Sequence, residues 1–261
     1  ARLLNEGRLV VFPTETVYGL GADARNDEAC REIYHAKGRP PDNPLIVHVA
    51  SIDQLAALSD GRPPTAALRA LELFSPGPIT VVLRHNGSVS PVATTGLSTV
   101  AVRIPSHPLA LALLQAARIP VAAPSANRSG RPSPTNYAMA RQAMEGRVSA
   151  IIDGGDCHVG VESTILDCTV TPQRILRPGG VTYEMLTAAG FEVVPPADED
   201  DEDAAAGGGA ELSAAGRPSE EAVPRGGAEI PGAGGDGSAG GTGGAEFPGA
   251  QTGPEPASHD Q

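Results

Sequence analysis

Two cationic residues, Lys37 and Arg39, stand two positions apart in a stretch that we interpret as a loop. Lys37 is the only lysine in the chain, whereas the other eighteen strong cations are arginines. Arginine offers a planar fork of donors and lysine a compact point charge, so a single retained lysine suggests a position that a guanidinium does not suit. Gly38 loosens the stretch, and prolines stiffen it after Arg39. We therefore predict an anion-binding loop, above all for a polyphosphate; the alternative is a solvated loop with a chance lysine.

Further polar residues stand at the ends of predicted strands. Thr16 follows one apolar strand, and Ser125 and Asn127 follow another. In open α/β sheets the loops at strand ends converge on a ligand crevice. The sequence thus predicts one site for a multiply charged anion and a small polar molecule, with four cations: Lys37, Arg39, Arg103 and Arg177.

The elements that must position these residues follow from apolar runs and capping residues. Strands are expected at residues 9–12, 45–49, 79–83, 100–104, 121–123, 150–152, 164–167 and 174–176. Helices are expected at residues 27–37, 52–58, 65–74, 108–117, 136–144 and 182–189, with Asp27 as the cap of the first. Residues 85–98 are polar and contain glycine, which predicts a mobile loop. The alternation of strands and helices predicts an α/β fold, a mixed sheet flanked by helices.

Charge divides the chain into two parts. Residues 197–261 carry fourteen acidic side chains, two arginines and half of the 32 glycines, which leaves seventeen charges of each sign in residues 1–196. We predict one folded domain at 1–196 and a disordered acidic tail at 197–261, because the tail has few large apolar groups to offset its ordering entropy. The three cysteines form no CxxC pair, which fits a reducing compartment and predicts a cytoplasmic protein. Apolar runs are too short to cross a membrane.

Several familiar chemistries do not match the sequence. No G-x-x-x-x-G-K-[ST] segment is present, and Gly19-Leu20-Gly21 lacks the third glycine of a dinucleotide fingerprint. Ser125 stands in Pro-Ser-Ala-Asn rather than in a nucleophile elbow. Cys157 and His158 have no partner pair at metal-ligand spacing, so no protein metal site is predicted. The residues thus favour binding and orienting an anion without a covalent nucleophile.

Seven segments, in order, resemble the YrdC family, the L-threonylcarbamoyladenylate synthases. They are 12–21 (FPTETVYGLG), 37–48 (KGRPPDNPLIVH), 76–80 (PGPIT), 102–105 (VRIP), 123–130 (APSANRSG), 161–164 (VEST) and 176–179 (LRPG). The family's K-x-R and S-x-N signature is met by Lys37 with Arg39 and by Ser125 with Asn127. The similarity extends over about residues 1–190 and is closest to the short, single-domain form.

The resemblance implies a twisted α/β fold with a large concave cationic cavity, and a nucleotidyltransferase reaction. L-Threonine, bicarbonate and ATP, with Mg²⁺ carried in by ATP, would give L-threonylcarbamoyl-AMP, diphosphate and water. A separate transferase would use the product to modify tRNA adenosine next to the anticodon.

The resemblance also implies a role for each matching residue. Catalysis would rest on Lys37 and Arg39. ATP would contact Lys37, Arg39, Asn43, Thr99, Ser125, Asn127, Ser133 and Arg177. Threonine would be held by Thr16, His48, Arg103, Ala123 and Ser163. Arg103 suits the amino acid's carboxylate, because a guanidinium binds it bidentately.

Two other functions remain open at this level. One is carbamoyl-adenylate formation, as in hydrogenase maturation proteins, which place this domain among other segments that this sequence lacks. The other is a module that binds double-stranded RNA or tRNA, which a net charge of zero in residues 1–196 disfavours. The acidic run 198–203 could also fold onto the cationic cavity, although an inert solvated tail is expected because exposed charge pairs are weak.

Overall fold

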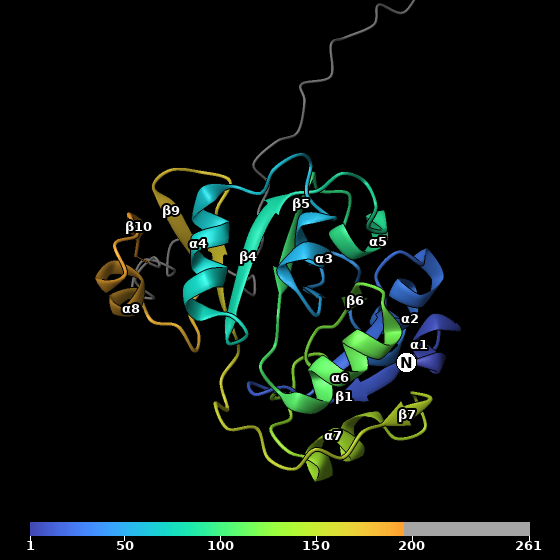
Figure 1. The fold of residues 1–261 in the computed structure, drawn as a ribbon. Coiled ribbons are helices and arrows are strands. Elements are labelled where there is room, and N and C mark those ends of the chain that lie inside the picture. The colour runs from blue at the N-terminus through green and yellow to red at the C-terminus, as the bar shows by residue number, and fades with distance from the viewer. Residues whose placement is uncertain (196–261) are drawn as a thin grey trace, which may run out of the picture. The chain divides into compact units, whose positions relative to one another are not determined.

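The structure, a computed structural model, describes residues 1–195. Its backbone is one ten-stranded mixed sheet in the order β10-β9-β8-β4-β5-β3-β6-β2-β1-β7 (Figure 1). Consecutive strands are often not neighbours, so residues distant in sequence meet on one face. The predicted α/β class with a mixed sheet flanked by helices is confirmed.

The elements have the following bounds. The strands are β1 (Val10–Phe12), β2 (Gly19–Asp23), β3 (Val47–His48), β4 (Ile79–Arg84), β5 (Thr99–Arg103), β6 (Val121–Ala122), β7 (Ala150–Ile151), β8 (Thr164–Asp167), β9 (Gln173–Arg177) and β10 (Val193–Val194). The helices are α1 (Arg2–Asn5), α2 (Asp27–Lys37), α3 (Ile52–Ala56), α4 (Thr65–Phe74), α5 (Pro91–Thr94), α6 (Pro108–Ala117), α7 (Tyr137–Met144) and α8 (Tyr183–Ala188).

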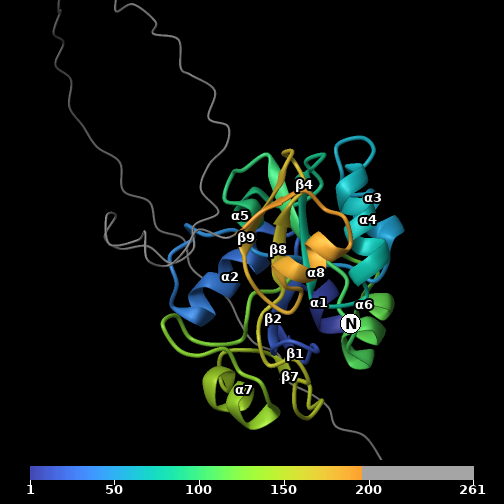
Figure 2. The ribbon, with the colours of Figure 1, turned by 90° about the vertical axis from the view of Figure 1, so that its left-hand side faces the viewer.

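Side-chain alternation gives the central strands two different faces. On β4, Val81 and Leu83 join the main core, where α4 packs against the strand, whereas Thr80 and Val82 point to the other side. Helices α4 and α2 both contribute to this main core, α4 where it packs on β4 and α2 where it packs on β2 (Figures 1 and 2). Arg103 follows the same rule on β5, because it is two residues from Ala101, which packs with Val82. The face away from α4 therefore carries polar side chains from several strands.

A smaller core fixes the strand that precedes Thr14. Val10 and Phe12 of β1 pack under α6 with Leu114, whereas Val11 points into the main core. The loop that follows Phe12 thus leaves a strand that is buried on both sides, which gives it a firm base.

Strand β2 was not among the predicted strands. Its sequence, Gly-Leu-Gly-Ala-Asp, lacks the β-branched and aromatic residues that mark strands. The structure shows why glycine stands at position 21: a Cβ there would lie 2.8 Å from the Phe12 ring and 3.0 Å from Val121. Close packing between neighbouring strands, which sequence pattern does not reveal, selects this residue.

The predicted helices are present with bounds shifted by a few residues at most. Three further details of the secondary structure differ from the prediction. Asn26, not Asp27, caps α2, because its side chain accepts hydrogen bonds from the backbone N–H groups of Glu28 and Ala29. The segment 85–98, predicted to be a loop, contains α5, and Ser90 within it donates a 2.6 Å hydrogen bond to Asp27. Strand β10 was also not predicted.

Two further predictions concern the C-terminal tail and membrane-spanning segments. The predicted tail, residues 197–261, lies outside the described residues, and so does residue 196, the last residue of the predicted domain. Within the part that the structure describes, no helix is long and apolar enough to cross a membrane.

Gly179 stands where the chain passes directly over the segment that begins β8. A Cβ on this residue would lie 2.5 Å from the backbone nitrogen of Thr164 and would also meet the carbonyl oxygen of Glu162. Backbone cannot rotate away as a side chain can, so Gly179→Ala should lower the free energy of unfolding by about 1–3 kcal/mol. Urea unfolding measures the change. Gly19→Ala is the control, since its Cβ would meet Ala123 and Phe12 at an ordinary 3.5 Å; equal losses in both variants would contradict the argument.

Candidate functional site

A cavity of about 290 Å³ opens on the face of the sheet that α4 does not cover. Its walls come from the loop after β1, the loop before β3, the ends of β5, β8 and β9, and the loop after β6. The residues that line it are Thr14, Thr16, Val17, Gly19, Arg39, Asn43, Pro44, Ile46, His48, Arg103, Ala123, Pro124, Ser125, Glu162, Ser163, Ile165, Leu176 and Arg177. Three guanidiniums thus share one hollow with several hydroxyl groups and an apolar wall.

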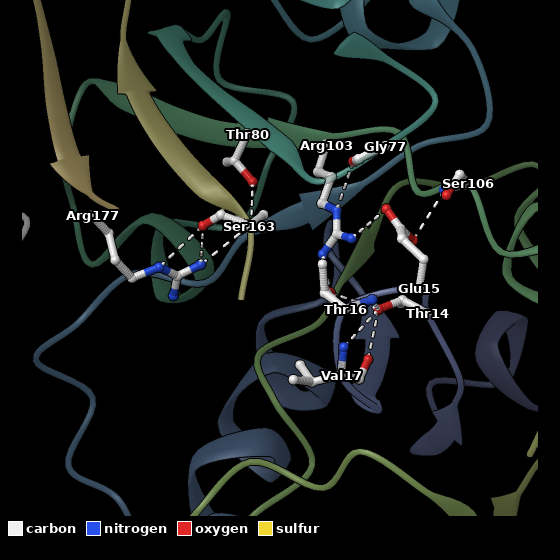
Figure 3. Close-up of polar contacts among 10 residues, drawn as sticks. All are labelled: Thr14, Glu15, Thr16, Val17, Gly77, Thr80, Arg103, Ser106, Ser163 and Arg177. Atoms are coloured by element: carbon white, nitrogen blue, oxygen red, sulfur yellow. Dashed lines mark hydrogen bonds and ion pairs between the residues drawn. The ribbon is translucent and has the colours of Figure 1, made fainter. Parts of the chain in front are cut away.

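Arg103 lines the cavity and is only 3% exposed, and we call the part of the cavity around it the inner end. Figure 3 shows its polar contacts. Its Nη2 donates to Glu15 Oε1 at 2.7 Å, its Nη1 to Thr16 Oγ1 at 2.9 Å, and its Nε to the carbonyl oxygen of Gly77 at 3.3 Å. A guanidinium has five N–H groups. Within residues 1–195, two of them therefore remain for a ligand.

A relay of hydroxyl groups orients Thr16. Thr14 donates its proton to the carbonyl oxygen of Val17 at 2.6 Å and accepts hydrogen bonds from the backbone N–H groups of Thr16 and Val17. The 2.9 Å contact between the two threonine hydroxyls must then have Thr16 as donor. Since Thr16 also accepts from Arg103, its hydroxyl is fixed in direction and faces the cavity as an acceptor.

Glu15 is the buried counter-ion of this end of the site. Its second carboxylate oxygen accepts a 3.1 Å hydrogen bond from the backbone N–H of Ser106, and both side chains of the ion pair are less than a tenth exposed. A buried charge is tolerated when it is paired and hydrogen-bonded. Glu15 therefore permits Arg103 to stay charged inside the protein.

His48 is a neutral member of the site. Burial, together with the nearby Arg103 charge, lowers its pKa to about 3, so the imidazole is uncharged at neutral pH. The two residues face each other on the paired strands β3 and β5, and Phe12 packs edge-on against the imidazole at 6.1 Å between ring centroids. Among the described residues, its buried Nδ1 has no hydrogen-bond partner. The ring thus supplies hydrogen-bonding capacity without a further positive charge.

Arg177 forms the second cationic wall. Its Nη2 and Nε donate to the carbonyl oxygen of Ser163 at 2.8 and 3.3 Å, and its Nη1 lies 2.9 Å from Glu162 Oε2. Ser163 in turn is held by a 2.8 Å hydrogen bond to Thr80 (Figure 3). Burial lowers the pKa of Arg177 from its ordinary value, and Glu162 opposes that shift.

Lys37 lies behind the cavity wall rather than in it. Its ammonium donates to the carbonyl oxygens of Ser125 and Asn127 at 2.5 and 2.8 Å and to Asn127 Oδ1 at 3.2 Å. Three acceptors around one nitrogen match the three donors of an ammonium, which a planar guanidinium does not reproduce. Burial, with the Arg39 charge, lowers the pKa of Lys37 to about 8, against the opposing effect of Glu162.

The thirteen residues predicted for the site fall into three groups. Nine line the cavity: Arg39, Asn43, Ser125, Arg177, Thr16, His48, Arg103, Ala123 and Ser163. Lys37, Asn127 and Ser133 lie one contact behind it, the last through a 3.0 Å hydrogen bond to Glu162. Thr99 stands apart, because it begins β5 beside Arg84, whereas Arg103 ends the strand. The expected gathering of four cations in one hollow therefore holds for three of them.

Three further polar residues of the site were not predicted: Thr14, Glu15 and Glu162. All three stand inside the segments that carried the family resemblance. The available signal was electrostatic, since buried cations require nearby carboxylates. For a metal, in contrast, no group of three His, Cys, Asp or Glu side chains within residues 1–195 is suitably arranged.

Fold and cavity together define an α/β protein with a buried, arginine-lined ligand site. The sequence model of the family Sua5_yciO_yrdC, described as "Telomere recombination", matches residues 2–179. The chain belongs to this family.

Individual relatives agree with this assignment. Threonylcarbamoyl-AMP synthase of Bacillus subtilis (strain 168) is 51% identical over 189 residues, 72% of this chain and 54% of the relative. The protein of the same name from Pyrococcus abyssi is 50% identical over 184 residues, 70% and 54% of the two chains. The crystal structure of P. abyssi Sua5 complexed with L-threonine matches with a TM-score of 0.71 and 47% identity, over 74% of this chain and 57% of that one. The chain spans about half the length of the curated relatives it matches.

The buried ion pair predicts a large effect on stability. Glu15→Ala leaves the Arg103 charge uncompensated inside the protein, so the free energy of unfolding should fall by about 3–5 kcal/mol. Glu145→Ala is the matched control, because Glu145 pairs with Arg141 at 2.8 Å with both side chains more than half exposed; its loss should be below about 1 kcal/mol. Denaturant unfolding measures both. A Glu15→Ala loss as small as that of the control would contradict the proposed role of Glu15.

Proposed function

We propose that the chain acts as an L-threonylcarbamoyladenylate synthase, which forms L-threonylcarbamoyl-AMP, diphosphate and water from L-threonine, bicarbonate and ATP. A separate transferase would pass the threonylcarbamoyl group to tRNA adenosine next to the anticodon. The observation that carries the proposal is a buried arginine, two of whose N–H groups have no partner within residues 1–195, in the same cavity as two further arginines. The names of the relatives support the same chemistry.

Threonine would bind at the inner end of the cavity. The two remaining N–H groups of Arg103 suit its carboxylate, and the acceptor oxygen of Thr16 suits its ammonium or hydroxyl group. Neutral His48 and the hydroxyl of Ser163 line the same space. Polar groups of this kind reject an amino acid without a hydroxyl more strongly than an apolar pocket does, because they would be left unpaired.

The phosphates of ATP would lie toward Arg39 and Arg177. Arg39 is anchored by a 3.4 Å hydrogen bond to the carbonyl oxygen of Asn43, which Tyr34 also holds at 3.0 Å. Ser125 lines the cavity beside them, and Lys37 supports its loop from behind. Fixed positive charge stabilises the negative charge that develops as diphosphate departs. Mg²⁺ enters as part of the substrate MgATP and neutralises further phosphate charge.

The reaction follows from holding these ligands side by side. The ammonium group of threonine first loses a proton to solvent; its amino nitrogen then bonds to the carbon of bicarbonate, and water leaves to give a carbamate. A carbamate oxygen then attacks the α-phosphorus, the bond from that phosphorus to the bridging oxygen breaks, and diphosphate leaves with the electron pair. The attacking oxygen is already anionic, so this step needs no protein base, which is consistent with a His48 pKa of about 3. Positioning and fixed charge are the contributions of the protein.

A diphosphate-release assay tests the proposal. The chain with MgATP should release diphosphate only when threonine and bicarbonate are both present. Arg103→Lys keeps a positive charge beside Glu15 but loses the planar fork, so the KM for threonine should rise by about tenfold or more while the KM for ATP changes little. Release without threonine, or stimulation by carbamoyl phosphate, would contradict the proposal. Salt-sensitive retention of double-stranded RNA without diphosphate release would favour a binding module instead.

The lowered pKa of Lys37 gives ATP binding a pH dependence of definite sign. Below about pH 8 the ammonium is charged and attracts phosphate; above it the charge is lost, so the affinity for MgATP should fall, by up to about tenfold between roughly pH 7 and pH 9. The thiol of Cys157, which lies near Thr14, does not titrate in this range, because burial raises its pKa to about 11. Calorimetry without threonine measures the affinity. Lys37→Met should bind more weakly than the wild type below about pH 8, approach it near pH 9 and lose this dependence; an unchanged slope would contradict the role of Lys37.

A further inference from the structure

Glu162 is the only acidic side chain among the described residues that line the cavity. Its Oε2 lies 2.9 Å from Arg177 Nη1, and its Oε1 accepts a 3.0 Å hydrogen bond from Ser133. Both of these partners stand among the residues expected to contact ATP: Arg177 ends β9 and lines the cavity, and Ser133 lies behind it in the loop before α7. A carboxylate therefore bridges two donors that suit phosphate oxygens.

The cation remains in place when the carboxylate leaves. Arg177 is also held by the carbonyl oxygen of Ser163 through two other nitrogens, and Ser163 is fixed by Thr80. The backbone of Glu162 is fixed as well, because its carbonyl oxygen accepts a 3.0 Å hydrogen bond from Gly180. The side chains of the pair are 27% and 36% exposed. Rotation of the partly exposed Glu162 side chain therefore suffices to exchange its carboxylate for another anion.

We propose that Glu162 is an internal competitor for the phosphate site, which occupies Arg177 and Ser133 in the empty cavity, yields to polyphosphate, and pairs with them again as diphosphate leaves. The inference rests on the proposed function for the identity of the anion. It assigns to Glu162 a role in product release: the carboxylate weakens the binding of diphosphate and thereby limits product inhibition. It also explains how three arginines are tolerated in one empty cavity, since two carboxylates neutralise two of them.

Glu162→Gln tests the proposal, because it keeps the shape of the side chain and removes its charge. The affinity for inorganic diphosphate, measured by calorimetry with the full chain in EDTA and again in Mg²⁺, should rise by about tenfold, the effect of one removed competing charge. The product-inhibition constant for diphosphate should fall by a similar factor. Glu162→Ala should change both in the same direction. Glu145→Gln, which neutralises the exposed carboxylate that pairs with Arg141, should change neither.

Each result separates this inference from the function on which it rests. An unchanged or weaker diphosphate affinity in both Glu162 variants overturns the inference, even if the wild-type chain has synthase activity. Weaker binding only in Mg²⁺ also overturns it and makes Glu162 a ligand of the metal that ATP carries. Tighter diphosphate binding in a chain without synthase activity supports the inference and contradicts the proposed function alone.

Discussion

The burial of Arg103 beside Glu15 is the interaction on which the rest of the site depends. A guanidinium at 3% exposure requires a counter-ion, and Glu15 supplies one at 2.7 Å with its second oxygen fixed by backbone. The pair leaves part of the guanidinium facing the cavity, which is the part that can recognise a carboxylate. The Arg103 charge has a second consequence: burial lowers the pKa of His48, and the Arg103 charge lowers it further, so the imidazole stays neutral. Burial and one ion pair thus together determine the charge state of the inner end of the cavity.

Strand alternation brings these groups to one face. His48 ends β3 and Arg103 ends β5, and the parallel pairing of these strands places the two residues side by side. Thr80 on β4 pairs with Arg103 across the other edge of β5 and holds Ser163. The opposite face of the same strands packs into the main core, with α4 against β4, and needs only apolar residues. A continuous apolar run that contains a single histidine or arginine therefore indicates a strand with one face in the core and polar side chains on the other.

The sequence predicted most of the positions and few of the contacts. Apolar runs and caps predicted the major helices and most strands, because these depend on local pattern. Strand β2 was not predicted, because the glycine at position 21 is required by a contact with the Phe12 ring on the neighbouring strand, which the local sequence pattern does not show. Lys37 was rightly singled out as unusual, but its ammonium binds the backbone of the loop at 125–127 rather than facing the cavity. Every residue has a backbone carbonyl oxygen, so the sequence does not show which carbonyl groups surround a cation. Residue types therefore do not tell whether a cation lines the cavity or supports a loop behind it. Glu15 and Glu162 were overlooked for a related reason, since the sequence does not say which carboxylate lies beside which arginine.

The two ion pairs of the cavity differ in a way that fits two kinds of ligand. Glu15 and Arg103 are 7% and 4% exposed in their side chains, whereas Glu162 and Arg177 are 36% and 27% exposed. Desolvation makes the first pair costly to separate, so it acts as a permanent part of the protein. The second pair is partly hydrated, and water can solvate the carboxylate when it moves, so exchange is far less costly. A small amino acid that must be recognised by shape needs a rigid partner, and a polyanion that must enter and leave needs an exchangeable one. The difference in burial between two otherwise similar ion pairs is therefore enough to give one cavity a fixed end and an exchanging end.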